Sequence, residues 1–233
     1  MNKNERKKWR WWPMAGIVLL QFFMPVLCRA ELIIIGLTGY VRFVFDDFNL
    51  LQNAVHKGDP ITGFYVYDST TPDSNPQSMF GEYNYTIAPY GMSLTSGNLT
   101  FLTDPANVNL TIGIVDNYGS PPPPGSDGYI VNSKTNLMLN NSLNLTMDNI
   151  IWQLHDYPGD ALSSDTLPST PPDLTQWGDN DLTIDGGKYP FPSPLEKTLF
   201  RIDGYVTDVY LIPEPMTMLF CLGGLVILRI KRT

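Results

Sequence analysis

The chain has 233 residues and a formal net charge of −8, with 43% hydrophobic, 12% aromatic and only 16% charged residues. Core-forming residues are too plentiful for a disordered chain, and the acidic balance argues against a nucleic-acid-binding protein, which needs a basic face. Two cysteines are too few for a disulfide framework, so 19 glycines and 20 prolines indicate an acidic, turn-rich β-type domain.

The first 30 residues have the three parts of a secretory signal peptide. A basic stretch is followed by the uncharged run Met14–Leu27 and then by Cys28-Arg29-Ala30, which has small residues at alternate positions. As a helix the uncharged run would be roughly 21 Å long, which is short for a hydrocarbon core of ~30 Å. We therefore expect export by the secretion translocase and cleavage between Ala30 and Glu31. An uncleaved anchor and a lipoprotein acylated at Cys28 are the alternatives.

Residues 31–212 would then form the exported body, which is more acidic than the whole chain. Residues 1–30 hold six basic and one acidic residue, and residues 213–233 hold three and one, which leaves six basic and 21 acidic residues in the body. Its formal charge is therefore −15, which repels polyanions and attracts cations. Both cysteines lie outside the body, so a processed protein would have no thiol chemistry.

The body alternates apolar and polar residues with a period of two, which is typical of half-buried antiparallel strands. The clearest runs are 64–67, 82–87, 99–101, 109–114, 143–147 and 200–210. Clusters of Gly, Pro, Asn and Asp separate them, and no helical period stands out. We predict an all-β fold, a single antiparallel β-sandwich of jelly-roll type, flanked by an N-terminal signal helix and a C-terminal transmembrane helix.

The last run carries two finer predictions. Phe200, Ile202, Val206 and Tyr210 are expected on one face, with Asp208 out of pattern. The first and last strands are expected to pair near residues 40 and 205, where a Gly-Tyr-Val triplet occurs in both.

Residues 158–194 contain seven prolines and predict long surface loops. Trp177 lies in this stretch and is the best candidate for a ring that stacks on a sugar. Trp152 lies in an apolar run and is expected in the core.

Acidic residues suggest weaker sites. Asp179, Asp181 and Asp185 have the oxygen ligands that calcium prefers but not the spacing of an EF-hand loop, so solvated loop acids are the alternative. His155-Asp156 offers the start of a hydrolytic triad, yet no Gly-x-Ser-x-Gly motif occurs and no carboxylate pair stands out. We expect no enzyme activity and no cofactor, with a secreted hydrolase as the alternative.

The C-terminus mirrors the N-terminus. Pro213-Glu214-Pro215 precedes the uncharged run Met216–Leu228, and three basic residues follow: Arg229, Lys231 and Arg232. The prolines keep the tripeptide extended and outside a sheet. The run would be ~20 Å long as a helix, which is marginal for a membrane span, and the basic residues place both chain ends in the cytoplasm. A buried C-terminal helix is the alternative.

This order of tripeptide, apolar run and basic tail resembles the PEP-CTERM sorting signal of Gram-negative bacteria, and residues 58–83 are similar to a stretch that recurs in such proteins. The resemblance implies a membrane-anchored precursor with its body in the periplasm. An exosortase would cleave it near residues 213–215, and the body would reach the cell surface or the exopolysaccharide matrix. The resemblance assigns no activity to the body, for which a carbohydrate-binding module is the alternative function.

Overall fold

The computed structural model describes residues 32–119, 125–143, 146–157, 159–188 and 198–213. The predicted signal peptide, the predicted transmembrane helix and the basic tail lie outside these ranges. Inside them the chain forms eleven strands, one 3-10 helix and no α-helix, which confirms the all-β prediction for these residues. No helix in these ranges has the length and apolar character needed to cross a membrane.

All strand pairs in the described residues are antiparallel. The strands are β1 Leu32–Phe45, β2 Pro60–Asp68, β3 Phe80–Tyr85, β4 Gly91–Ser96, β5 Leu99–Thr103, β6 Leu110–Tyr118, β7 Ser126–Ser133, β8 Asn136–Leu139, β9 Thr146–Asp156, β10 Asp179–Lys188 and β11 Thr198–Leu211. The 3-10 helix η1, Leu174–Gln176, precedes β10.

Strand β9 closes the sheet on itself. It pairs with β10 along one edge and with β7 and β8 along the other. In the described residues the order β10-β11-β1-β2-β4-β5-β8-β9 therefore returns to β10 as a closed eight-stranded barrel, and β7, β6 and β3 extend from it. The predicted sandwich is wrong. Sandwiches and barrels both bury one face of each strand, so a period of two cannot distinguish them.

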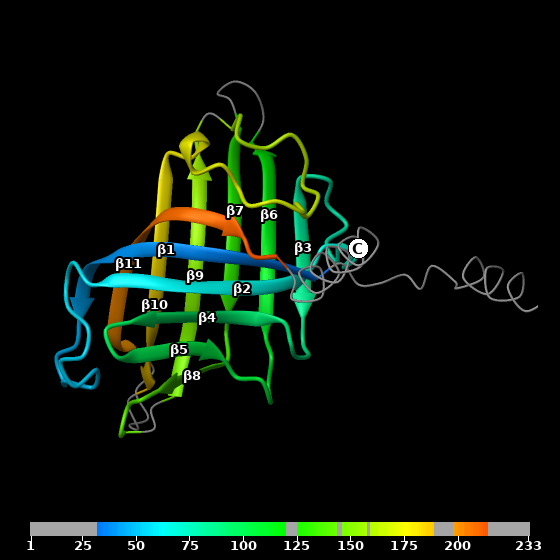
Figure 1. Ribbon diagram of the computed structural model, residues 1–233. Helices are drawn as coiled ribbons and strands as arrows, with labels where there is room; N and C mark the ends of the chain where they lie inside the picture. The colour runs from blue at the N-terminus through cyan, green and yellow to red at the C-terminus, as the bar shows by residue number, and fades with distance from the viewer. Residues whose placement is uncertain (1–31, 120–124, 144–145, 158, 189–197, 214–233) are drawn as a thin grey trace, which may run out of the picture. The chain divides into compact units, whose positions relative to one another are not determined.

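The sheet branches where β7 ends and β8 begins. Ser133 lies opposite Ile150 and Asn136 opposite Met147, so β7 and β8 follow β9 in one unbroken register. On their other edges, however, β7 pairs with β6 and β8 pairs with β5. Two groups of strands therefore diverge from this point, and Figure 1 shows β3, β6, β7 and β9 running across β1, β2, β4 and β5.

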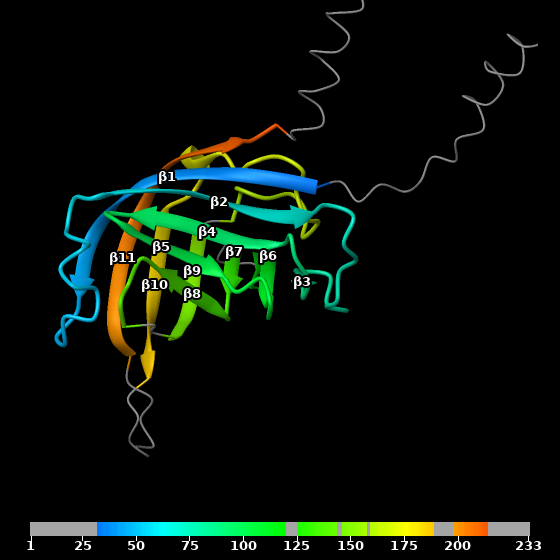
Figure 2. The same cartoon turned by 60° about the horizontal axis from the view of Figure 1, so that its bottom comes forward.

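The long strands β1 and β11 bend around the barrel, as Figure 2 shows. They pair with each other, and Tyr40 lies opposite Tyr205, which confirms the predicted pairing of the first and last strands. Register shifts occur after Thr38 and after Val41, as expected where a bulge lets a strand turn a barrel corner.

One of these bulges corrects a prediction about β11. Thr38 lies opposite Asp208 but Gly39 lies opposite Val206, so Thr207 is the extra residue. The alternation reverses there, which explains why Asp208 falls out of pattern. Phe200, Ile202 and Val206 are buried as predicted, whereas Tyr210 is 43% exposed and does not share their face.

The barrel interior is packed with large side chains. The rings of Tyr65, Tyr129 and Trp152 are in mutual contact, with Trp152 centred 6.0 Å from Tyr65 and 5.7 Å from Tyr129. The two tyrosine hydroxyls share a hydrogen bond of 2.8 Å. This cluster links β2, β7 and β9 and is fully buried, so the barrel is a packed core rather than an open channel.

Candidate functional site

The first and last described residues lie side by side. Ile35 on β1 is opposite Leu211 on β11, and the Ile212 amide donates a 2.8 Å hydrogen bond to the Ile34 carbonyl. Pro213, the first residue of the predicted sorting tripeptide, follows directly and is exposed. The chain therefore enters and leaves the barrel at neighbouring points.

The other predicted processing residues cannot be placed. Ala30 and Glu31 precede the described residues, and Glu214, Pro215, Arg229, Lys231 and Arg232 follow them. The predicted cleavage points therefore remain predictions from the sequence.

Trp177 does not lie on an open surface. Its side chain belongs to the hydrophobic core and is only 9% exposed. Just before it, Asp173 caps η1 by accepting hydrogen bonds from the Thr175 amide and hydroxyl at 3.0 and 2.8 Å, which also lower the pKa of Asp173. The Pro-rich stretch thus turns inward at Trp177, and this ring has no free face for a sugar.

Trp152 is in the core as predicted and is fully buried. Its indole N–H donates a 3.1 Å hydrogen bond to the Asn180 side chain, whose amide donates in turn to the Val206 carbonyl at 2.7 Å. This chain of bonds ties β9, β10 and β11 together at the closure of the barrel.

The three candidate calcium ligands are in a strand, not in a loop as predicted. Asn180, Leu182 and Ile184 point into the core, so the intervening acids of β10 point outward. Asp179 and Asp185 are six residues apart, which is about 20 Å along a strand. Within the described residues no three acidic, His or Cys side chains gather in a way that would hold a metal.

These acids instead make separate contacts. Asp181 pairs with Arg42 of β1. Asp185 accepts a 3.2 Å hydrogen bond from Asn149 of β9. Partial burial raises the pKa of Asp185, the Asn149 bond opposes that shift, and nearby Asp148 adds to it.

Two buried carboxylates were not predicted from the sequence: Asp127 was not named, and Asp156 was named only as a candidate acid of a triad. Asp127 on β7 and Asp156 on β9 lie opposite each other and are 1% and 6% exposed. Asp127 accepts the amides of Asn117 and Leu162 at 2.8 and 2.7 Å, and Asp156 accepts those of Gly159 and Asp160 at 3.0 and 2.9 Å. They therefore fasten the loop after β9 to the barrel. The one signal in the sequence is the Pro-Gly turn that follows Asp156.

Asp156, the acid of the predicted His155-Asp156 pair, holds the turn that follows β9. Its carboxylate Oδ2 is occupied by two backbone amides of the next turn. These two bonds give Asp156 a structural role, and the hydrolase alternative stays a prediction from the sequence.

Comparison with protein-family models gave no match, and comparisons with curated proteins and with solved structures gave none at a significant level. The sorting signal therefore stays a prediction from the sequence.

Proposed function

We propose that this protein is exported and displayed at the cell surface or in the exopolysaccharide matrix, and that its C-terminus is a PEP-CTERM sorting signal. In this proposal the barrel is the cargo, and an exosortase-type enzyme carries out the processing chemistry. The proposal assigns no catalytic activity to the barrel.

The observation that carries the proposal is the position of the barrel between the two predicted signals. The strand β1 begins at Leu32 and β11 ends at Leu211, so the described barrel lies in the chain between the two predicted signals. Because Ile212 is hydrogen-bonded to Ile34, both signals would leave from one corner of the barrel. A domain held at one corner needs no rearrangement to stay folded while both ends engage the same membrane.

Exposure of Pro213 supports access by a processing enzyme. The two prolines of the tripeptide remove backbone donors and disfavour its joining the sheet after β11. On this reasoning the tripeptide would be presented as an extended segment, the form that a membrane-embedded processing enzyme would need to bind.

The test is the mass and location of the protein in its own host. We expect the mature species to lack both the N-terminal 30 residues and the basic tail. Replacement of Pro213, Glu214 and Pro215 by alanines should leave the tail in place and keep the protein in the membrane fraction. The control is Pro76→Ala, in the exposed loop between β2 and β3, which should be processed normally.

Two results would contradict the proposal. One is an intact C-terminus in a host with an active exosortase. The other is a full-length protein in the cytosol.

A further inference from the structure

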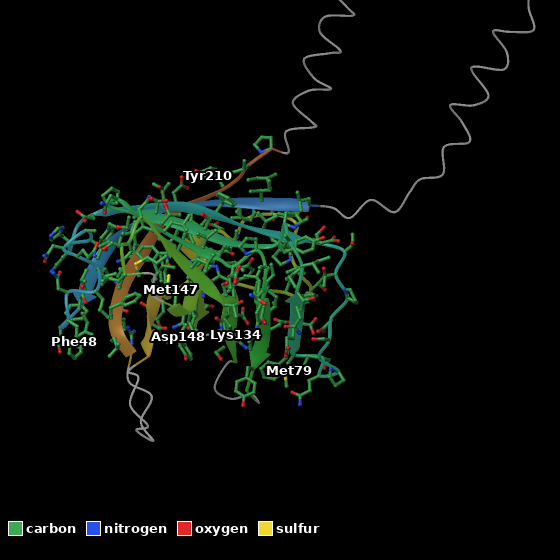
Figure 3. All side chains as sticks on the ribbon, turned by 90° about the horizontal axis from the view of Figure 1, so that it is seen from below. Phe48, Met79, Lys134, Met147, Asp148 and Tyr210 are labelled. Atoms are coloured by element: carbon green, nitrogen blue, oxygen red, sulfur yellow. The ribbon has the colours of Figure 1, made fainter. Side chains whose placement is uncertain are left out.

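Six neighbouring strands of the barrel share an outer face with few charged side chains. The strands are β11, β1, β2, β4, β5 and β8, and each pairs with the next. One cross-strand row on it consists of Tyr210, Gly36, Phe64, Ser93, Leu102 and Leu137. We call this surface the outer face, and Figure 3 shows Tyr210 on it, on the opposite side of the β1 layer from Met147 and Asp148.

A second row lies beside the first and is dominated by hydroxyl groups. It consists of Asp208, Thr38, Thr62, Thr95, Thr100 and Leu139. Tyr40 and Tyr205 continue the face beyond it, with their ring centres 5.8 Å apart. Asp208 is the only charged side chain in the two rows, although the body as a whole has a formal charge of −15.

The Tyr210 ring packs against Gly36. A Cβ atom on Gly36 would collide with three adjacent atoms of the Tyr210 ring, Cδ2, Cε2 and Cζ. The ring therefore lies over the glycine backbone, and with 43% of its surface exposed it turns its other side to solvent. Phe64 lies on the opposite side of Gly36 and is 41% exposed, so two rings flank one glycine.

We propose that the outer face binds a neutral polysaccharide. Exposed rings offer apolar surfaces for the C–H faces of sugar rings, and the threonine row offers donors and acceptors for sugar hydroxyls. Six strands at a spacing of ~4.8 Å make the face about 24 Å wide, enough for several sugar units in a row. This inference goes beyond the sorting proposal and does not depend on it.

Charge and polarity favour this occupant over others. Two copies of a domain with a charge of −15 repel each other, and an acidic polymer or an anionic membrane is repelled as well. The hydroxyls of Thr95 and Thr100 bond to each other at 3.2 Å, but a lipid or an apolar protein surface would bury those of Thr38 and Thr62 without giving them partners, which is costly. A neutral polysaccharide supplies hydroxyl partners for Thr38 and Thr62 and meets no net repulsion.

The test uses the purified full chain and insoluble cellulose, chitin, curdlan and mannan as probes. We expect retention on at least one of them. Tyr210→Leu keeps an apolar side chain but removes the ring, so it should weaken retention about tenfold, in line with the loss of one stacked ring at other polymer-binding sites. Thr62→Val, which removes one hydroxyl, should weaken it as well.

Tyr157→Ala is the matched control, because Tyr157 is 73% exposed and follows β9, away from the outer face. It should bind like the unaltered protein, and all variants should keep the same thermal unfolding midpoint. The proposal is overturned if no neutral polysaccharide retains the protein, or if Tyr210→Leu binds as well as the control. It is also overturned if Tyr210→Leu changes self-association or vesicle binding and leaves retention unaltered.

Discussion

At the scale of single residues, the hydroxyl pair of Tyr65 and Tyr129 allows the energy of one buried hydrogen bond in the core to be measured. Their hydroxyls are 2.8 Å apart in the packed interior, and burial raises the pKa of both phenols well above the usual value. Both phenols therefore stay protonated near neutral pH, and their hydrogen bond does not change with pH there.

We predict that Tyr65→Phe and Tyr129→Phe each destabilise the protein by about 1–3 kcal/mol, because each leaves the partner hydroxyl buried without its bond. The double variant should cost less than the sum, since neither hydroxyl is then left behind. Urea unfolding of the four proteins measures this coupling. Strictly additive costs would show that the two hydroxyls do not depend on each other.

Asp185 provides a test of pH dependence. Partial burial raises its folded-state pKa above the unfolded value, so the folded protein holds the proton more tightly. The contribution of Asp185 to the free energy of unfolding therefore falls as the pH rises from its pKa in the unfolded state through its higher pKa in the folded state. At neutral pH its carboxylate is a net cost.

Asp185→Asn should accordingly be more stable than the unaltered protein at pH 7. Its amide oxygen can still accept the hydrogen bond from Asn149. The advantage should shrink as the pH falls through the acidic range, as followed by urea unfolding at a series of pH values. Asp181→Asn is the control, because it loses the ion pair with Arg42 and should bring no gain at pH 7. Equal behaviour of the two variants would contradict the interpretation.

At the scale of elements, the turn between β4 and β5 requires glycine. Ser96 lies opposite Leu99, so Gly97 and Asn98 form a two-residue loop. Gly97 has a φ of +59°, and a Cβ there would collide with the Ala54 carbonyl oxygen. A side chain at this position is therefore strained by both its backbone conformation and its surroundings.

We predict that Gly97→Ala costs about 1–3 kcal/mol. Asn98→Ala should cost much less, because Asn98 is exposed and its contact with Asn140 is made by its backbone carbonyl. Thermal unfolding of both variants measures the difference. Equal costs would show that the loop tolerates a side chain at residue 97.

The elements also show which structural features could be predicted from the sequence. Local apolar pattern predicted the strands and buried Trp152, and the repeated Gly-Tyr-Val triplet predicted the Tyr40–Tyr205 pairing. The pattern did not reveal the bulge at Thr207, where one extra residue reverses the faces and brings Tyr210 to the outside. It also placed β10 in a loop, because proline and acid content outweighed the alternation of Asn180, Leu182 and Ile184.

Barrel closure and the outer face could not be predicted from the sequence, for a related reason. Alternation says which side chains share a face of one strand but not which strands are neighbours. The threonine row becomes visible only when Thr38, Thr62, Thr95 and Thr100 are aligned across four strands. The position of β9 between β10 and the β7–β8 line is also a pairing that no single segment encodes.

At the scale of the whole molecule, the excess of acids should oppose folding. With a formal charge of −15 on the body, the compact state suffers from self-repulsion, which salt screens. The exposed pairs Arg42–Asp181 and Arg201–Asp203 lose some attraction in salt, but such pairs contribute only about 0–1 kcal/mol each.

We therefore predict that the unfolding midpoint rises between low salt and moderate sodium chloride at neutral pH. Thermal unfolding across a salt series measures this. A midpoint that falls with salt would show that specific ion pairs outweigh the general repulsion.

Closure of the barrel depends on β11, the last strand of the described residues. β11 pairs with β1 on one side and with β10 on the other, and it supplies Phe200, Ile202 and Val206 to the core. Without it β1 and β10 would both become open edges, each able to pair with other chains. A chain of residues 32–213 should unfold cooperatively, whereas a chain of residues 32–197 should aggregate or remain unfolded.

Size-exclusion chromatography and urea unfolding of the two truncated chains measure this difference. A third chain, residues 32–213 with Val206→Asp, separates strand pairing from core packing, because it keeps the backbone of β11 but places a charge where Val206 is buried. We expect it to be destabilised yet to regain monomeric folding with an added stabilising osmolyte, which chain 32–197 should not do. If chain 32–197 folded as well as chain 32–213, then closure by β11 would not be what holds the barrel together.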